Sequence, residues 1–452
     1  MKTKNIDLTK GNEMKSIVLF SLPLIAGNLF QQLYNLVDTL VVGKFVGSNA
    51  LAAVGSSYMT MTFLTSIIIG LCMGSGVIFS YFYSAKKPEQ LSQSFFQSFI
   101  FIFGVTVIIN GFSFLFIDEI LQLLNIQKNI FAMTKEYLLI IFAGMFFVFL
   151  YNYFAAVLRS MGNSVIPLVF LIISSLLNIV LDYLFVVPLH MGVQGAGYAT
   201  FIAQVVSAFG ILLYTLKCVP EMKLRREMFV IKKSSLKKIV NQSILTSVQQ
   251  SIMNLGILMV QGLVNSFGIT VMAGFAVAVK IDSFAYMPVQ DFGNGFSTYV
   301  AQNRGAGKIE RIHTGTKSAV KLILITCVVI STLIFLFSSS LMKCFVTARE
   351  TDVILEGVRY LHIVCPFYCL IGFLFMFYGL YRGMGNPQMS IVLTIISLGT
   401  RVVLAYILSD IKWISVVGIW WAIPVGWFLA DFIGFIYYRK YKKKDYKNLR
   451  LS

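Results

Sequence analysis

The sequence predicts an all-α polytopic membrane protein, with twelve transmembrane helices in two six-helix bundles related by a pseudo-two-fold axis along the membrane normal. Three observations predict this class: the composition, the repeated long apolar segments and a repeat between the two halves of the chain. The 452 residues are 57% hydrophobic and only 12% charged, about half the charged fraction of a soluble domain. Because apolar segments recur along the whole chain, a soluble domain with a single anchor is excluded.

Apolar segments between charged or turn-like breaks define the twelve helices. Each is roughly 20 residues or longer, which is the length that crosses a hydrocarbon core of about 30 Å. The first six predicted spans are 16–42, 51–84, 91–117, 133–158, 164–187 and 193–216. The second six are 242–265, 270–303, 314–340, 354–381, 387–409 and 415–438.

The distribution of basic residues predicts the orientation. With the N-terminus inside, 27 of the 37 Lys and Arg residues fall in inner segments and 5 in outer segments, as the positive-inside rule requires. The net charge of +18 is therefore a topology signal facing an anionic leaflet, and it does not indicate nucleic-acid binding. We expect a multi-pass protein of the inner or cytoplasmic cell membrane, with both termini cytoplasmic. The predicted parts are a cytoplasmic tail 1–15, an N-terminal bundle 16–216, a basic cytoplasmic linker 217–241, a C-terminal bundle 242–438 and a basic cytoplasmic tail 439–452.

The two halves share an internal repeat. The segment "LRSMGNSVIP" at 158–167 resembles "YRGMGNPQMS" at 381–390, an offset of 223 residues. The same offset pairs the "IIS" triplets at 172–174 and 395–397. Six helices per half is an even number, so both halves enter the membrane from the same side and the repeat is parallel. Such paired bundles favour an alternating-access transporter.

Several stretches resemble the multidrug and toxic compound extrusion family, especially its branch of DNA-damage-inducible transporters. They are "SLPLIAGNLFQQLYNLVDTLVVGKFVGSNALAAVG", "LRSMGNSVIPLVFLIISSLLNIVLDYLF", "GVQGAGYAT" and "AVKIDSFAYMPVQDFGNGFSTYVAQNRGAGK". The resemblance covers nearly all twelve spans. It implies a twelve-helix antiporter that exports cationic, amphipathic drugs in exchange for protons or sodium, with no cofactor other than the coupling ion.

Asp38 is the first candidate for ion coupling, because it lies in an apolar run with no other charge before Lys44. A carboxylate inside a membrane helix costs several kcal/mol and marks a functional site. At about 1.5 Å per residue, Asp38 and three residues of the fifth and sixth spans fall at similar depths in the outer half. These three are Asn178, Asp182 and Thr200. The resemblance implies that the matching positions form a cation site in the N-terminal lobe.

The chemistry of this group leaves the coupling ion open. Two carboxylates in a water-poor site can share one proton, and the same hard oxygens can coordinate sodium. A structural interpretation also remains, in which Asp38 is an interfacial residue pairing with Lys44 and Asp182 caps the chain near Pro188.

The second half does not repeat this group. At the offset of 223, Asn178 corresponds to Arg401 and Asp182 to Ala405, so we expect coupling through one lobe only. The C-terminal bundle is instead expected to bury four charged residues on two of its spans. They are Lys280, Asp282, Asp291 and Arg401. Either they neutralise one another as a structural network, or one acid meets a cationic substrate. Asp431 is a lone acid, and no role is assigned to it.

Two prolines within predicted spans, Pro23 and Pro288, are candidate helix hinges, because proline removes a backbone hydrogen bond. Polar or amphipathic intramembrane residues are candidates for a substrate cavity, where aromatic and methionine side chains suit varied amphipathic cations. The candidates are Tyr34, Asn152, Tyr153, Gln249, Gln250 and Asn254.

Other functions are less well supported. A flippase for lipid-linked oligosaccharides of the same superfamily is the main alternative, and it would need more basic residues in its cavity. An enzyme would need clustered nucleophiles or ligands, whereas His190, His313 and His362 are scattered and no CxxC motif occurs, so neither catalysis nor a metal site is indicated. The expected partners are a small cationic amphipathic substrate and membrane lipid, and we expect a monomer.

Overall fold

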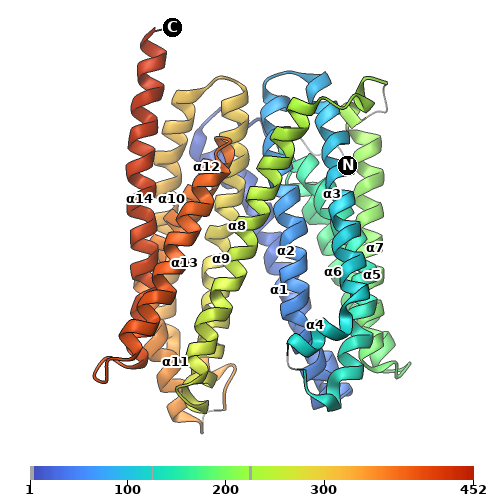
Figure 1. Ribbon diagram of the computed structural model, residues 1–452, viewed down its shortest axis with the longest axis vertical. Helices are drawn as coiled ribbons and strands as arrows, with labels where there is room; N and C mark the ends of the chain where they lie inside the picture. The colour runs from blue at the N-terminus through green and yellow to red at the C-terminus, as the bar shows by residue number, and fades with distance from the viewer. Residues whose placement is uncertain (1–4, 125, 223–225, 348, 452) are drawn as a thin grey trace. The chain divides into compact units, whose positions relative to one another are not determined.

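A computed structural model describes residues 5–124, 126–222, 226–347 and 349–451. Within these residues the chain is helical, with no strand, and 12 helices are long and apolar enough to cross a membrane (Figure 1). The predicted fold class, an all-α protein with twelve candidate transmembrane helices, is confirmed.

The first half follows the predicted spans closely, and the ends of each helix lie within a few residues of the predicted ends. A short extra helix, α4, lies between the third and fourth spans. The helices are α1 (Glu13–Phe45), α2 (Ser48–Ser84), α3 (Pro88–Leu115), α4 (Ile117–Leu123), α5 (Lys128–Ser160), α6 (Val165–Val186) and α7 (Gly192–Cys218).

The second half contains α8 (Lys233–Asn265), α9 (Ile269–Gly305), α10 (Ile309–Lys343), α11 (Thr351–Val364), α12 (Tyr368–Gly383), α13 (Pro387–Ser409) and α14 (Val416–Leu451). The tenth predicted span is two α-helices joined by the 3₁₀ turn Cys365–Phe367, because Pro366 has no N–H for an α-helical hydrogen bond. Helix α8 begins inside the predicted linker, and α14 continues through the predicted C-terminal tail.

The repeated "MGN" turns end equivalent helices in both halves. Gly162 and Gly385 adopt φ angles of +84° and +73°, a left-handed conformation that glycine adopts without strain. Asn163 Oδ1 then accepts the N–H of Ile166 at 3.1 Å, and Pro387 begins α13 at a position where no N–H is needed. The repeated sequence therefore corresponds to a repeated glycine turn at the end of a helix in each half.

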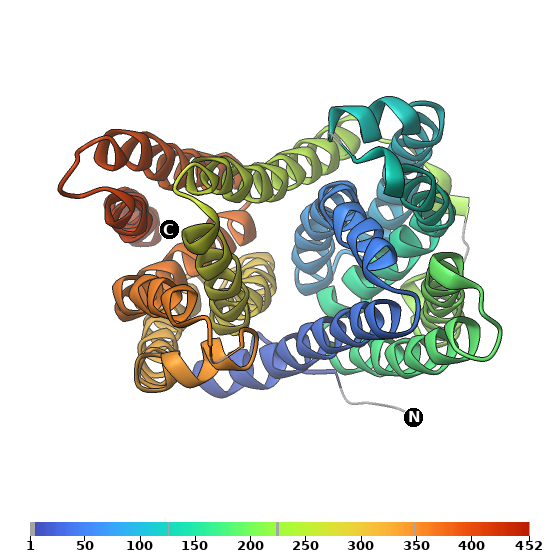
Figure 2. The ribbon, with the colours of Figure 1, turned by 90° about the horizontal axis from the view of Figure 1, so that it is seen from below.

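The chain forms two compact units, and the boundaries between them cut α1 and α8. Unit 1 comprises Ala26–Ser247 and the described residues before Leu8, and unit 2 comprises Leu8–Ile25 and the described residues from Val248 onward. These units differ from the predicted bundles 16–216 and 242–438 in the first turns of both helices. Seen nearly end-on, the helices of each unit stand side by side (Figure 2).

Aromatic side chains fill the core of each unit. In unit 1, Phe79 of α2 packs edge-on against Phe95 of α3 with ring centroids 4.8 Å apart. In unit 2, Trp420 of α14 stacks on Phe275 of α9 at 5.0 Å and meets Tyr360 of α11 edge-on at 5.1 Å. Such pairs add about 0.5–1.5 kcal/mol to the area that they bury.

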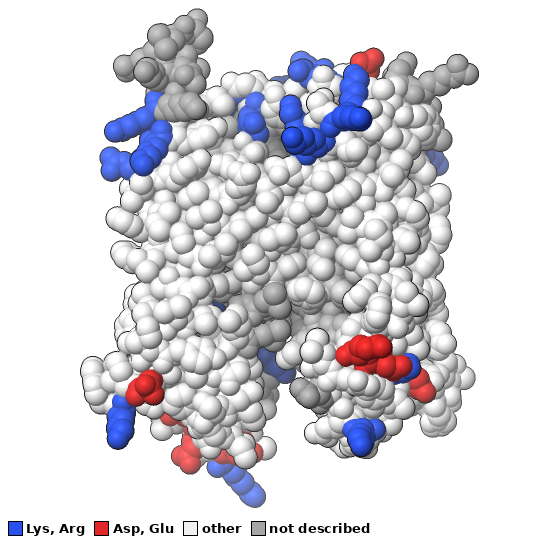
Figure 3. All heavy atoms as spheres, in the orientation of Figure 1, with Lys and Arg blue, Asp and Glu red and all other residues white. Residues whose placement is uncertain are grey.

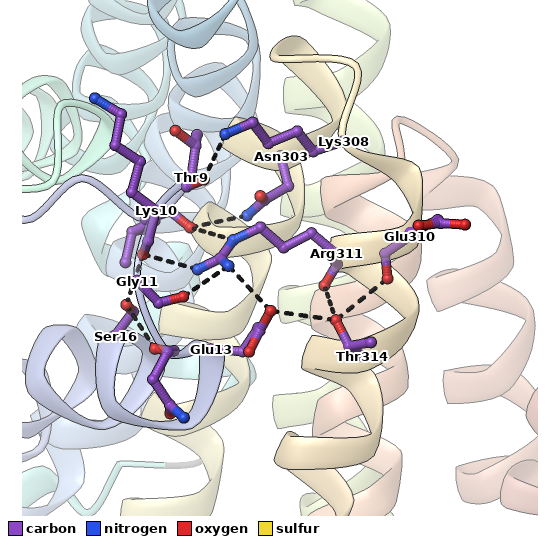
Figure 4. Close-up of polar contacts among 12 residues, drawn as sticks. Thr9, Lys10, Gly11, Glu13, Ser16, Asn303, Lys308, Glu310, Arg311 and Thr314 are labelled. Carbon is purple, nitrogen blue, oxygen red and sulfur yellow. Dashed lines mark hydrogen bonds and ion pairs between the residues drawn. The ribbon is translucent and has the colours of Figure 1, made fainter.

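The segment before α1 is held in unit 2 by polar contacts to α9 and α10 (Figure 4). Arg311 donates to the carbonyl oxygens of Lys10 and Gly11, both at 2.8 Å, and pairs with Glu13 at 3.0 Å. Asn303 donates to Leu8 O at 3.1 Å. We call Leu8–Glu13 with these partners the N-terminal anchor. It explains why the first turns of α1 belong to unit 2.

Charged side chains on the face drawn in Figure 3 lie mainly near the ends of the helices, and the band between the ends is largely uncharged. This is the distribution expected of a chain that places its middle in hydrocarbon. The protein is therefore a multi-pass membrane protein.

Candidate functional site

A hydrophobic cluster in unit 1 brings together the helices that carry the predicted cation site. Val42 of α1, Val186 of α6 and Ala196 of α7 belong to it. Asp38, Asp182 and Thr200 each lie four residues from one of these on its own helix. Residues four apart share a helix face, so the polar side chains form the next layer beneath the apolar cluster.

All four predicted site residues are buried. The exposed fraction is 8% for Asp38, 2% for Asn178, 0% for Asp182 and 7% for Thr200. Burial favours the interpretation of Asp38 as a site residue over that of a solvent-facing residue. The Lys44 ammonium group lies over the Phe45 ring at 5.6 Å and has no ion pair with Asp38 among the described residues.

Asn178 connects the members of the site. Its amide nitrogen lies 3.3 Å from Thr200 Oγ1 in one orientation of the amide group. The opposite orientation satisfies both amide atoms, because the nitrogen donates to Asp182 Oδ2 at 3.2 Å and the oxygen accepts the Thr200 N–H at 3.2 Å. The amide orientation is an assignment from the hydrogen-bond network, and the second orientation leaves fewer polar atoms unpaired. Asn178 therefore positions the Asp182 carboxylate against α7.

One oxygen of each carboxylate has no hydrogen-bond partner among the described residues. These atoms are Asp38 Oδ1 and Asp182 Oδ1, and the two carboxylates are close enough to repel each other electrostatically. A buried charge without a partner is costly. Binding a proton or a small cation removes this cost, which is the chemistry that the arrangement supports.

Two tyrosines adjoin the carboxylates. Tyr34 of α1 and Tyr137 of α5 both interact electrostatically with Asp38 and Asp182, and Tyr137 also belongs to the apolar cluster. Tyr34 was a candidate for the substrate cavity, whereas Tyr137 was not singled out from the sequence. Depth along the helix could have identified Tyr137, because it lies four residues into the predicted span 133–158, a depth comparable to that of Thr200.

The other cavity candidates lie in different surroundings. Asn152 donates to Val148 O of its own helix at 2.9 Å. Tyr153 is fully buried in the aromatic core and donates to Phe95 O, so it has no surface for a substrate and we do not include it in the proposed cavity. Three candidates lie on α8 in unit 2: Gln249 is buried, and Gln250 and Asn254 are half-buried.

The predicted charge network of the C-terminal bundle is only partly assembled. Asp282 of α9 accepts a hydrogen bond from Tyr360 at 3.1 Å, and Arg401 of α13 interacts with it electrostatically. Lys280 is exposed, and Asp291 is buried further along α9. The structure therefore brings together Asp282 and Arg401, and it turns Lys280 away from the interior of the unit.

The two predicted hinge residues lie inside continuous helices. Pro23 lies within α1 and Pro288 within α9. Pro23 is two residues before Ile25, the last residue of α1 that belongs to unit 2. Proline has no N–H, so α1 lacks one backbone hydrogen bond at Pro23. This position is close to the boundary between the two units.

Comparison with known proteins gives consistent results. The MatE family model matches residues 23–184 and 243–407. The chain is 29% identical to the probable multidrug resistance protein YpnP of Bacillus subtilis, over 96% of this chain and 97% of that protein. It is 25% identical to the probable multidrug resistance protein NorM of Thermotoga maritima, over 90% of this chain and 88% of that protein.

A solved structure shares the fold over nearly the whole chain. It is the outward-facing conformation of a multidrug resistance MATE family transporter of the MOP superfamily, with a TM-score of 0.92 and 25% identity over 97% of this chain and 98% of that chain. The family model covers most of both repeat halves, and Asp38 and Asp182 lie within its first matched segment. The chain therefore belongs to the MatE family, whose members are membrane transporters and not enzymes.

Proposed function

We propose that this protein is a secondary active antiporter that exports cationic amphipathic drugs or other toxic organic compounds in exchange for protons or sodium. The relatives described as multidrug resistance proteins support the substrate class. The observation that carries the coupling mechanism is the pair of buried carboxylates, Asp38 and Asp182, each with an unpartnered oxygen.

The proposed mechanism uses the charge of this pair. With one positive ion bound, the pair carries one negative charge fewer and the buried site is stable without a further cation. After the ion leaves, the two negative charges repel each other in a medium of low dielectric. A cationic substrate in the same unit then lowers the free energy of the ion-free state. The substrate and the coupling ion thus bind alternately, which is what exchange requires.

Helix α1 connects ion binding to alternating access in this proposal. The N-terminal anchor fixes its first turns in unit 2, whereas Asp38 lies in the part that belongs to unit 1. Pro23 lies close to this boundary and provides a place where the helix can bend. A change of charge at Asp38 would then alter the curvature of a helix that is fixed at its other end.

The proposed location is the inner or cytoplasmic cell membrane, with both termini in the cytoplasm and a monomeric protein. The excess of Lys and Arg in the predicted inner segments supports this orientation. The substrate enters as a small molecule from the cytoplasm or the inner leaflet.

The test is ethidium efflux from proteoliposomes under a proton gradient or a sodium gradient applied separately. The gradient that drives efflux identifies the coupling ion. We expect Asp38→Asn and Asp182→Asn each to reduce gradient-driven efflux at least about tenfold, a loss of about 1.4 kcal/mol, because each variant removes one negative charge from the site.

The matched control is Asp118→Asn. Asp118 is partly exposed and pairs with Lys135 at 2.7 Å, so its removal should leave efflux unchanged. Gradient-driven efflux that persists in both Asp38→Asn and Asp182→Asn would contradict the proposed coupling site.

A further inference from the structure

Unit 2 contains a buried acid, Asp431 of α14, that the candidate cation site does not include. Its side chain is 8% exposed, and neither carboxylate oxygen has a hydrogen-bond partner among the described residues. Asp431 lies 15 residues after Val416, the first residue of α14, about 22 Å along the helix axis. It is therefore deep within the hydrocarbon region and one turn or more from either end of the span.

Asp431 has a hydroxyl group as an electrostatic neighbour, and no ion pair of Asp431 occurs among the described residues. Tyr378 of α12 interacts electrostatically with Asp431, and its hydroxyl pairs with the side chain of Thr394 on α13. Helix α11 meets α14 near its start, through Tyr360 and Trp420, away from Asp431.

A row of polar side chains runs along the buried face of α13. Ser390, Thr394, Ser397 and Arg401 are all buried, and their spacing of four, three and four residues places them on one face. The row extends about 16 Å, from a point three residues after the start of α13 to Arg401. We call these four residues the α13 polar row. Arg401 at its far end interacts with Asp282, whose Oδ1 also has no partner.

The chemistry at Asp431 favours a proton over a metal ion. A carboxylate without a countercharge in low dielectric becomes neutral by taking up a proton. Metal cations such as sodium or calcium need several ligands at once, and no group of three or more His, Cys, Asp or Glu side chains that could hold a metal ion occurs among the described residues. A single carboxylate with nearby hydroxyl groups is sufficient for a proton.

We propose that Asp431 is a proton-binding site of unit 2, loaded and unloaded through the hydroxyl groups of Tyr378 and the α13 polar row. The repeat equivalent of Asp431 at the offset of 223 is Ala208, so this site is specific to the second half. A proton site at Asp431 would add a second ion-binding site, in the C-terminal half, to the one expected in the N-terminal half. Its use in antiport depends on the proposed function, but its proton binding does not.

The test uses infrared spectroscopy of the full-length protein reconstituted in lipid, without any substrate. The carbonyl stretch of protonated carboxylic acids is recorded in D₂O buffers from acidic to alkaline pD. We expect the wild type and the double variant Asp38→Asn/Asp182→Asn to show a band that Asp431→Asn lacks. This band should disappear reversibly at alkaline pD, because the proton leaves through the polar row.

Two further variants sharpen the test. Asp431→Glu should restore a carboxylic-acid band at a shifted frequency, which keeps the test valid if Asp431→Asn does not fold. Thr394→Val should slow hydrogen–deuterium exchange of the Asp431 band severalfold, whereas Thr332→Val, at an exposed position on α10, should not change it.

Two results would overturn the proposal. One is a spectrum of Asp431→Asn that is identical to that of the wild type, which would mean that Asp431 carries no proton. The other is a band that persists at every pD without exchange, which would mean a fixed structural acid. Failure of the proposed function is a separate result, because it appears as retained efflux in the Asp38 and Asp182 variants.

Discussion

At the scale of single residues, the candidate cation site is defined by carboxylate oxygens of Asp38 and Asp182 that have no hydrogen-bond partner among the described residues. Asn178 is the one side chain that joins Asp182 to α7, and it does so with both atoms of its amide. Asp38 has no comparable partner for Oδ1 among the described residues. The two acids therefore have different surroundings: Asn178 orients Asp182 and makes no hydrogen bond to Asp38.

Tyr137 tests whether the neighbours of the carboxylates contribute to ion binding. We expect Tyr137→Phe to keep the ring in the apolar cluster and therefore to change the free energy of unfolding by less than about 1 kcal/mol. Loss of the hydroxyl should nevertheless increase the concentration of coupling ion that gives half-maximal efflux, by about threefold to tenfold (about 0.7–1.4 kcal/mol), because Tyr137 interacts electrostatically with Asp38 and Asp182.

The control is Tyr183→Phe. Tyr183 lies on α6 near the site, but 55% of its side chain is exposed. Equal ion dependence for wild type and Tyr137→Phe would show that Tyr137 belongs only to the core.

At the scale of elements, α1 is divided between the two units: its first turns pack in unit 2 and its later turns pack in unit 1. Its first turns pack on α9, where a Cβ added at Gly295 would meet Ser21 and Leu24, and its later turns lie against α6, where a Cβ at Gly27 would meet Leu171 at 3.2 Å. Close packing on both sides of Pro23 restricts bending to a short stretch of the helix.

The N-terminal anchor should be sensitive to Arg311. We expect Arg311→Ala to increase hydrogen–deuterium exchange of the backbone amides in Leu8–Glu13 at least about tenfold, because the side chain holds two carbonyl oxygens and one carboxylate. If the anchor fixes the end of α1, efflux should also fall although Asp38 and Asp182 are unchanged.

Lys317→Ala is the matched control, because Lys317 is an exposed basic residue on the same helix. An unchanged exchange rate in Leu8–Glu13 of the Arg311→Ala protein would mean that the anchor does not depend on this side chain.

At the scale of the whole molecule, two native cysteines test the orientation in the membrane. Cys218 ends α7 and Cys344 follows α10, and both are exposed. The predicted topology puts Cys218 inside and Cys344 outside. A membrane-impermeant maleimide applied to intact cells should therefore label Cys344 alone, and should label Cys218 after permeabilisation.

Cys344→Ser and Cys218→Ser identify the two labelling sites. The buried cysteines Cys72, Cys327 and Cys365 provide an internal background. Labelling of Cys218 in intact cells would reverse the orientation, and with it the direction of the proposed export.

Sequence patterns predicted the helices well, because hydropathy and length act locally. All twelve spans are found, most of them within a few residues of their predicted limits; the start of α8 and the end of α14 lie further out, and Pro366 divides the tenth span. Limits that depend on packing were less predictable. Nothing in the apolar pattern indicates that Lys233 begins a helix or that the first turns of α1 belong to unit 2.

The site shows the same division. Depth could be counted from the sequence because each helical residue rises about 1.5 Å, and this count placed Asp38, Asn178, Asp182 and Thr200 in the outer half of the membrane. The direction in which a side chain points around its helix depends on the helices that surround it. For this reason the sequence did not predict that Tyr137 lies beside the carboxylates, that Tyr153 is buried in the core, or that Lys280 is exposed.

The sequence by itself determined that the protein is a duplicated, twelve-span membrane protein with rare acids at particular depths, because the cost of burying charge in hydrocarbon acts on each helix separately. Only the tertiary structure decided which acids have partners. Asp282 accepts a hydrogen bond from Tyr360 and has a nearby arginine, whereas neither oxygen of Asp431 has a hydrogen-bond partner among the described residues, because side chains from different helices meet only when the helices pack.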